Sequence, residues 1–282
     1  MNSNTLILHN LANNGDLFVS RSFVRDLCEK LNGNVIYLHK YDPNYLFNDI
    51  SLKEFKTQAF PIDDNEKRVY STWYAAKNRR YMEGTGCTIQ TLYKLFSEMY
   101  FNLGLPINSI QSYIPSINFE KYQFKSNKRN TQNVLICNNI PLSGQSSTDD
   151  MSLFIEQLAR SCPKKIFFVT NETKKHLNYP NIIYTKNILK TNNLIEISCF
   201  SKECSYIIGR ASGPYTFSFI KENFDDGVKF FEIAYPNHMG ENFNLANFGL
   251  QKLGYNNFLN LNCEEPLENI LKKIVFELHL HD

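Results

Sequence analysis

The stretch LILHNLANNGDLFVSRSFVRDL, residues 6–27, decides how the first half of the chain folds. A short apolar run is followed by asparagines, a glycine and an aspartate, and then by apolar residues at helical spacing. This order predicts a buried strand over 5–9, a turn, and a helix over 21–31. Because Asn, Gly and Asp build turns and helix caps anywhere, the turn has a purely structural interpretation. The second interpretation is that the turn presents helical N–H groups to an anionic ligand, with the Asp16 carboxylate fixed beside it.

The rest of the chain continues to alternate strands with helices. We predict further strands over 34–39, 68–75, 134–137, 165–170, 181–185, 205–208 and 228–234, and further helices over 88–103, 151–161, 194–200, 215–223 and 266–280. Alternation of this kind implies parallel sheets that are covered by helices on both faces. The predicted fold class is therefore α/β.

A polar and basic stretch, KYQFKSNKRNTQ at 121–132, has no apolar periodicity and is the best candidate for a linker. It divides the chain into an N-terminal domain over 1–124 and a C-terminal domain over 132–282. The closing helix over 266–280 is free to pack back on the N-terminal domain. Ligands of open parallel sheets bind at the carboxyl ends of the strands, so both domains are expected to present their strand-to-helix loops to a cleft between them.

The composition argues against several classes of function. With 30 basic and 28 acidic residues, the chain has no bulk charge that would attract nucleic acid. The seven cysteines include no CxxC pair, which indicates free thiols in a reducing compartment and no zinc site. The N-terminus, MNSNTLILHN, lacks the features of a signal peptide, and no apolar run is long enough to span a membrane. We therefore expect a cytoplasmic protein; peripheral membrane contact and the oligomeric state are left open.

The stretch IIGRASGPYTF, residues 207–217, is the second candidate for a ligand-binding turn. A strand ends, a turn of small residues follows, and a helix opens with Pro214 near its first position, where a missing N–H loses nothing. Ser212 is placed to cap this helix. The N–H groups that follow Ser212, including that of Gly213, would form a positive nest for a diphosphate, with Arg210 adjacent. An ordinary capped helix is the alternative interpretation.

A third stretch, YPNHMGEN at 235–242, follows the strand predicted over 228–234 and should lie at the same edge of the second sheet. Glu241 could accept hydrogen bonds from a ribose, and His238 could contact a phosphate or a base; the alternative is that both are plain loop residues. The sequence contains neither GxGxxG nor GxxxxGK[ST], which argues against a nicotinamide enzyme and a P-loop kinase.

Two of these stretches resemble a known family. NNGDLFVSRSFVRDL resembles the glycine-aspartate turn of bacterial heptosyltransferase-like glycosyltransferases, and GRASGPYTFSF resembles the strand-turn-helix in their second domain. These proteins have the GT-B architecture, in which two Rossmann-like domains face each other across a cleft. The resemblance implies an acceptor-side N-terminal domain and a C-terminal domain that binds the nucleotide-sugar donor.

The resemblance also implies an activity: transfer of a sugar from a nucleoside diphosphate to a surface glycan or its lipid-linked precursor, by direct displacement with inversion and without a cofactor. Asp16 occupies the position of the catalytic base. The implied donor-binding residues are Asn14, Gly15, Arg210, Ser212, Gly213, Pro214, His238 and Glu241. No Asp-x-Asp motif occurs, so stabilising the departing diphosphate falls to helix N-termini and Arg210 rather than to a metal.

The sequence departs from the family at three points. Ala211 and Thr216 stand where the family usually carries an acidic residue and a histidine, and the stretch 138–145 lacks the lysine often found after the first strand of the second domain. Ala211 and Thr216 favour a second hypothesis, a non-catalytic sugar- or nucleotide-binding protein of GT-B type, whereas Asp16 and the intact turn Ser212-Gly213-Pro214 favour the enzyme. A nucleotide-sugar epimerase of related architecture is a third, with no motif of its own in support.

Overall fold

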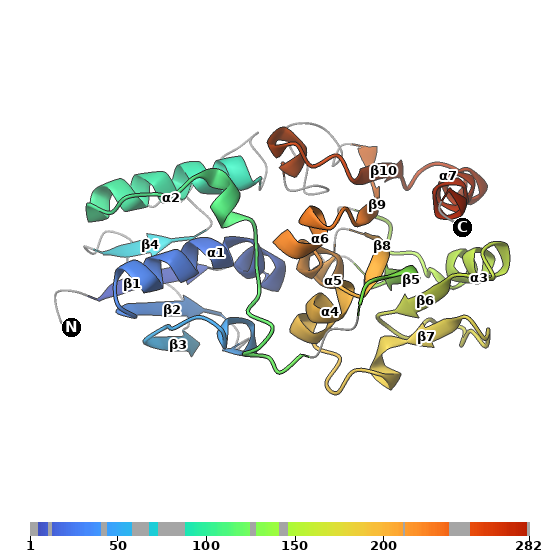
Figure 1. Cartoon of the computed structure of the whole chain (residues 1–282), viewed down its shortest axis with the longest axis horizontal. Coiled ribbons are helices and arrows are strands. Elements are labelled where there is room, and N and C mark those ends of the chain that lie inside the picture. The colour runs from blue at the N-terminus through green and yellow to red at the C-terminus, as the bar shows by residue number, and fades with distance from the viewer. Residues whose placement is uncertain are drawn as a thin grey trace. The chain divides into compact units, whose positions relative to one another are not determined.

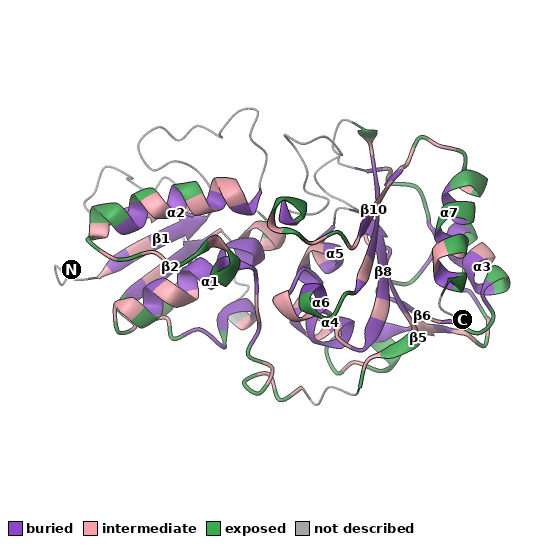
Figure 2. Cartoon of the chain, turned by 45° about the horizontal axis from the view of Figure 1, so that its top comes forward, coloured by how far each residue is buried: buried purple, intermediate pink, exposed green. Residues whose placement is uncertain are grey.

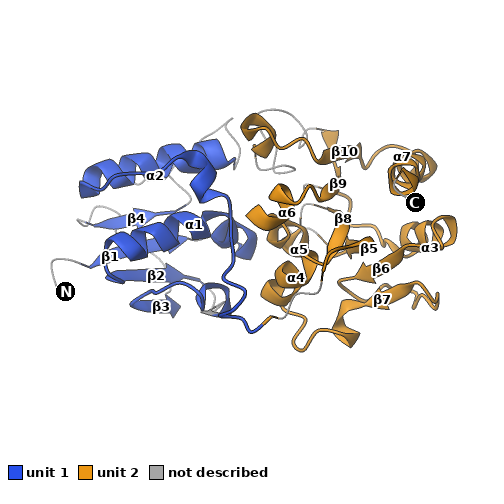
Figure 3. Ribbon diagram, in the orientation of Figure 1, with its two compact units in different colours: residues 1–123 blue, residues 124–282 orange. Residues whose placement is uncertain are grey.

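The computed structural model describes residues 5–10, 13–40, 44–57, 68–72, 88–124, 128–140, 146–210, 212–236 and 249–280. The chain divides into two compact units, Met1–Gln123 (unit 1) and Phe124–Asp282 (unit 2), which are coloured separately in Figure 3. Each unit has its own sheet, in which every pair of neighbouring strands is parallel (Figure 1). The predicted α/β class with parallel sheets is confirmed.

Unit 1 contains a four-stranded sheet in the order β3-β2-β1-β4. Its strands are β1 (Leu6–Asn10), β2 (Val35–His39), β3 (Glu54–Thr57) and β4 (Val69–Ser71), and its main helices are α1 (Asn14–Lys30) and α2 (Ile89–Leu103). The short 3-10 helices η1 (Asn44–Phe47) and η2 (Ile110–Tyr113) complete it. The successive residues Leu8, His9 and Asn10 of the central strand are buried, as expected of a parallel strand that is covered on both faces.

Unit 2 contains a six-stranded sheet in the order β10-β9-β8-β5-β6-β7. Its strands are β5 (Asn130–Cys137), β6 (Ile166–Val169), β7 (Ile182–Tyr184), β8 (Cys204–Arg210), β9 (Lys229–Ala234) and β10 (Phe258–Asn262). Numbered within the unit, this is the 3-2-1-4-5-6 order of dinucleotide-binding folds, and unit 1 follows the same order over its strands. The strand order reverses between β1 and β4 in unit 1 and between β5 and β8 in unit 2, and these are the positions where such sheets bind ligands.

Helices cover both faces of the unit 2 sheet. On one face, α3 (Ser152–Ser161) and α7 (Leu267–His279) pack into an apolar core with Ile136, Ile208 and Phe231. On the other face lie α4 (Leu194–Ser201), α5 (Gly213–Phe217) and α6 (Lys221–Asp225) (Figure 1). The outward sides of the helices are exposed, whereas the strands are mostly buried (Figure 2). The buried side of the closing helix α7 thus belongs to the core of unit 2.

Two predicted helices differ from those observed. The first helix begins at Asn14 rather than at residue 21, so the asparagine-glycine-aspartate segment forms its first turn instead of a free turn. Asp16 causes this early start, because its Oδ2 accepts the Asn13 N–H at 2.7 Å as the acidic half of a capping box. The helix predicted over 215–223 is broken into α5 and α6, since the buried Asn223 amide donates to the Ser218 carbonyl at 2.9 Å and ends the first helix there.

The strands β3 and β10 were not predicted. In β3 three of four residues are exposed, and in β10 the strand alternates apolar residues with asparagines. The strand predicted over 68–75 is shorter, and residues 73–75 lie outside the described part of the chain.

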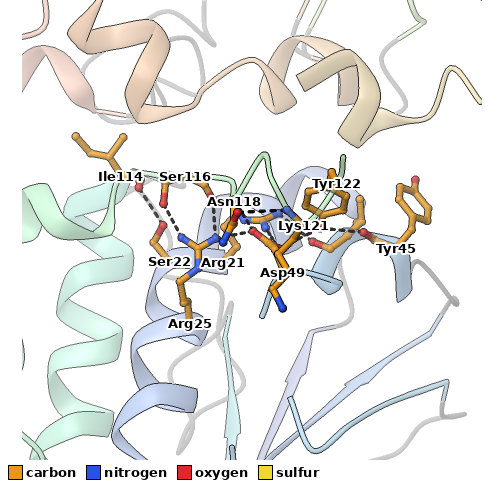
Figure 4. A network of polar contacts seen from close by, with 11 residues as sticks. Arg21, Ser22, Arg25, Tyr45, Asp49, Ile114, Ser116, Asn118, Lys121 and Tyr122 are labelled. Carbon is orange, nitrogen blue, oxygen red and sulfur yellow. Dashed lines mark hydrogen bonds and ion pairs between the residues drawn. The ribbon is translucent and has the colours of Figure 1, made fainter. Parts of the chain in front are cut away.

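A buried charge network joins α1 to the segment that leads out of unit 1 (Figure 4). The Asp49 carboxylate accepts hydrogen bonds from Arg21, Arg25 (2.8 Å), the Asn118 N–H (2.9 Å) and the Tyr122 hydroxyl (3.0 Å). The side chains of Arg21 and Asp49 are almost fully buried. Burial alone would raise the pKa of Asp49, but Arg21, the Asn118 N–H and Arg25 together hold that pKa below its ordinary value.

We predict that Asp49→Asn destabilises unit 1 by about 3–5 kcal/mol, because it leaves the buried Arg21 guanidinium without a counter-charge. Urea unfolding measures the free energy. The matched control is Glu54→Gln, which breaks the exposed pair with Lys56 and should change stability by less than about 1 kcal/mol. If Asp49→Asn lowered the free energy of unfolding by as little as Glu54→Gln, the network would be dispensable for stability.

Candidate functional site

The carboxyl edge of the unit 1 sheet carries polar side chains where the strand order reverses. Asn10, the last residue of β1, donates from Nδ2 to Thr72 Oγ1 at 3.1 Å, directly after β4. The Tyr37 hydroxyl on β2 lies 2.7 Å from the same Thr72 oxygen. The sequence analysis missed Asn10 and Thr72; the signal that could have found them is that Asn10 directly follows the predicted apolar strand and Thr72 lies within a predicted strand, each next to another polar residue.

Asp16 lies beside this edge, in the first turn of α1. Burial raises the pKa of its carboxyl group from 3.8 to about 6, and the Asn13 N–H and the charge of Lys40 oppose that rise without cancelling it. The carboxyl group is therefore ionised at neutral pH but more basic than an ordinary aspartate. One oxygen, Oδ2, holds the helix cap.

Asn14 and Gly15 precede Asp16 in the same helical turn, so the structure brings together the three site residues predicted in unit 1. The Asn14 Oδ1 atom is buried and has no hydrogen-bond partner among the described residues. The first N–H groups of a helix have no intrahelical partner, and α1 is 17 residues long. This turn combines N–H donors, an unpartnered amide oxygen and a basic carboxylate.

The second predicted group, in unit 2, lies where β8 ends and α5 begins. Ser212 takes the N-cap position, as predicted, but its side chain makes no capping hydrogen bond, and Oγ is buried without a partner in the part of the chain that the structure describes. Gly213 and Pro214 form the first turn of α5, with Pro214 at the helix start as predicted. Because α5 has five residues, its macrodipole is small, and the turn offers individual N–H groups instead.

Arg210 is held by the backbone of its own unit. Its guanidinium donates to the carbonyls of Asn138 (2.9 Å), Ser147 (2.8 Å) and Asp149 (2.7 Å), and the residue is 3% exposed. Burial lowers the pKa of Arg210, an effect that Asp149 and Asp150 oppose. These bonds hold backbone groups of the connection between β5 and α3. Arg210 therefore stabilises the loop at the carboxyl end of β5. Its contact with a donor phosphate remains a prediction.

Amide and hydroxyl side chains line the neighbouring strand ends of unit 2. Thr170, after β6, donates to Asn139 Oδ1 at 2.8 Å and lies 3.2 Å from Asn138 Oδ1, directly after β5. Asn138 Oδ1 also accepts the Asn171 N–H at 2.8 Å. The sequence analysis noted the stretch that contains these asparagines only because it lacks a lysine of the family. In the structure, their hydrogen bonds join the ends of β5 and β6.

His238, Glu241 and Ala211 lie outside the described residues. Within the described ranges, no group of three or more His, Cys, Asp and Glu side chains could hold a metal ion. The same ranges contain no helix of the length and apolarity needed to cross a membrane.

No family model matches the sequence, and no curated protein matches it. Two solved structures share its fold over nearly the whole chain. A family 9 glycosyltransferase from Veillonella parvula is 10% identical, with a TM-score of 0.50, and the match covers 99% of this chain and 97% of that one. The ADP-heptose lipopolysaccharide heptosyltransferase II of E. coli is 10% identical, with a TM-score of 0.50 and coverage of 98% and 99%.

The chain therefore has the fold of the GT-B glycosyltransferases. More particularly, it has the fold of the heptosyltransferase-like members, as the two short motifs indicated. At 10% identity this likeness establishes the fold and leaves activity to be argued from the residues.

We predict that Arg210→Ala lowers the free energy of unfolding of unit 2 by about 2–4 kcal/mol without any ligand, because three backbone carbonyls lose a charged donor. Chemical denaturation measures this. Arg160→Ala is the control, since Arg160 is 65% exposed in its pair with Glu156 and should contribute less than about 1 kcal/mol. Unchanged stability in Arg210→Ala would mean that the guanidinium is free to serve a ligand instead.

Proposed function

We propose that the protein is a glycosyltransferase that moves a sugar from a nucleoside diphosphate donor to a glycan or lipid-linked glycan acceptor, with inversion and without a metal. The observation that carries the proposal is Asp16: a carboxylate at the ligand-binding edge of unit 1 with a pKa of about 6. The fold shared with glycosyltransferases supports the same conclusion.

In the proposed reaction the acceptor hydroxyl attacks the anomeric carbon of the donor sugar from the face opposite the diphosphate. As the new C–O bond forms, the bond to the diphosphate oxygen breaks and the configuration inverts. Asp16 takes the hydroxyl proton, which becomes acidic only as the new bond forms, so a base of pKa near 6 suffices.

The departing diphosphate needs groups that stabilise its negative charge. We assign this role to the N–H groups after Ser212, with the Ser212 hydroxyl as a further donor, because that side chain is buried without a partner among the described residues. Gly213 contributes an N–H, whereas Pro214 has none and serves to fix the helix start. Arg210 contributes indirectly, by holding the neighbouring loop.

The second candidate function is binding of a sugar or nucleotide without transfer. It rests first on Ala211 and Thr216, which stand where heptosyltransferase-like proteins usually carry an acidic residue and a histidine. It rests also on Arg210, whose guanidinium donates to backbone carbonyls. A panel of nucleoside diphosphates, tested by thermal shift, identifies the ligand, because a ligand that binds only the folded state raises the melting temperature. Both functions predict a shift; hydrolysis or transfer of the matching nucleotide-sugar separates them.

We predict that Asp16→Asn lowers turnover by about 10²–10⁴-fold and leaves donor affinity and melting temperature nearly unchanged. An Asn side chain at this position can still accept the Asn13 N–H through its amide oxygen, but it cannot take a proton at neutral pH. In the wild type, turnover should rise with pH as the Asp16 carboxyl loses its proton near pH 6, and this limb should vanish in the variant.

Glu29→Gln, at an exposed position of the same helix, is the control for a change of charge on α1 and should keep wild-type turnover. If Asp16→Asn transfers sugar at a rate near that of the wild type, then Asp16 is a cap alone and the proposed mechanism is wrong.

A further inference from the structure

A row of four residues crosses the unit 2 sheet beneath α5. Cys137 on β5 pairs with Gly209 on β8, Gly209 pairs with Glu232 on β9, and Glu232 pairs with Asn260 on β10. Residues that pair directly across neighbouring strands share a face of the sheet. Glu232 is 1% exposed, so a carboxyl group is buried in the middle of this row.

Tyr215 of α5 lies directly on the row. A Cβ atom at Gly209 would come within 2.6 Å of Tyr215 Cδ2, so the glycine is what allows the ring to rest on the strand. The ring also makes edge contacts with Phe219 at 5.1 Å and Phe230 at 6.2 Å between centroids. Tyr215 is 1% exposed and follows directly after the turn Ser212–Gly213–Pro214, so a displaced ring would move that turn.

The polar atoms of this cluster are not paired with each other. Glu232 Oε2, Asn260 Oδ1 and the Tyr215 hydroxyl are buried and have no hydrogen-bond partner among the described residues. Because no opposite charge of a described residue compensates the group, burial raises the pKa of Glu232 to about 8. The carboxyl is therefore mostly neutral at pH 7.

In the part of the chain that the structure describes, the groups around Glu232 carry no positive charge. The Tyr215 hydroxyl on α5 and the Cys137 thiol on β5 both have pKa values raised by burial and are neutral, and Asn260 on β10 is uncharged. Arg210 follows Gly209 on β8, so its side chain points to the opposite face of the sheet from Glu232. Its hydrogen bonds to the connection between β5 and α3 are consistent with this direction. On α6, Lys221 is bonded to Asp225 in an exposed pair.

We propose that Glu232 is a positioning residue for the turn Ser212–Gly213–Pro214: in its neutral form it allows Tyr215 to rest on β8, and its ionisation displaces Tyr215 and the turn. The inference rests on the proposed function for one consequence: ionisation of Glu232 weakens binding of a nucleoside diphosphate at that turn. The cause is solvation, because an ionised carboxylate in the interior draws in water or moves toward it. Either change would displace the Tyr215 ring, which lies against the neighbouring Gly209.

The first arm of the test needs no ligand. The backbone amide resonance of Gly213, assigned in the ¹⁵N-labelled full chain, is followed from pH 6 to 9.5 in the wild type, Glu232→Gln and Glu268→Gln. We expect the wild type and Glu268→Gln, which changes an exposed glutamate of α7, to show a transition near pH 8. Glu232→Gln, which has the same shape and no titratable proton, should show none. A Gly213 signal that is constant in the wild type, or that titrates equally in Glu232→Gln, overturns the inference.

The second arm measures stability and so checks that Glu232→Gln folds. The folded-state pKa of Glu232 is raised above the ordinary 4.5 to about 8. The folded state therefore keeps a proton that the unfolded state releases, and stability falls as pH rises through this window. The melting temperature of the wild type should drop between pH 6 and 9 relative to that of Glu232→Gln. Parallel curves for the two proteins would contradict a buried, titrating carboxyl.

The third arm uses the nucleoside diphosphate that gives the largest thermal shift. Its affinity for the wild type should fall at least tenfold between pH 7 and 9, and its affinity for Glu232→Gln should stay constant. If no nucleoside diphosphate binds while Gly213 still titrates through Glu232, the proposed function fails and the positioning role stands. If the nucleotide binds with the same pH profile in both proteins, the positioning role fails and the proposed function stands.

Discussion

Parallel strands cannot be joined by tight turns, and this constraint organises both units of the chain. Each connection must cross from one end of the sheet to the other, so every strand-to-helix loop emerges at the same edge. The strand order reverses between β1 and β4 and again between β5 and β8, and the loops diverge at these points. Asp16 and Ser212 both follow a strand at such a reversal, which makes them candidates for chemistry before their side chains are considered.

Each unit contains a buried charged group that is held by several hydrogen bonds. In unit 1, Asp49 gathers two arginines together with the Asn118 N–H and the Tyr122 hydroxyl. In unit 2, Arg210 binds three carbonyls of one connection. A buried ion is stable only when several hydrogen bonds replace its lost hydration. Each network therefore fixes several backbone groups at once, and rigid backbone is what a site made of N–H donors needs.

The sequence predicted what depends on local pattern and failed where distant contacts decide. Strand-helix alternation was visible because buried parallel strands are apolar runs and because α2 places Ile89, Leu92 and Leu95 on one face. The break between α5 and α6 was not visible, since it depends on Asn223, which is buried between Ser201 and Ser218. The engagement of Arg210 was hidden for the same reason: its acceptors lie 61 to 72 residues away along the chain.

The burial of Glu232 was equally hidden. An isolated glutamate in an apolar strand gives no sign of which face it occupies. Its position beside Gly209, on which the Tyr215 ring rests, depends on the register of β9 against β8. Gly209 offered a faint signal, because a glycine inside a strand often marks the close approach of another group. The glycine alone does not identify the group that approaches it. The sequence therefore could not show that Tyr215 rests on this strand.

The two interpretations of the turn at Asp16, helix cap and catalytic base, are compatible in the structure. The early start of α1 places the carboxylate against the helix end, where one oxygen accepts the Asn13 N–H. The same placement buries the group, and burial raises its pKa to about 6 by more than the cap lowers it. An exposed aspartate would have a pKa near its ordinary value of 3.8 and would be a weaker base. A buried aspartate without the cap would have a pKa above that of Asp16. The cap therefore opposes the effect of burial and favours the ionised form of the carboxylate, which is the form that the proposed catalytic role requires.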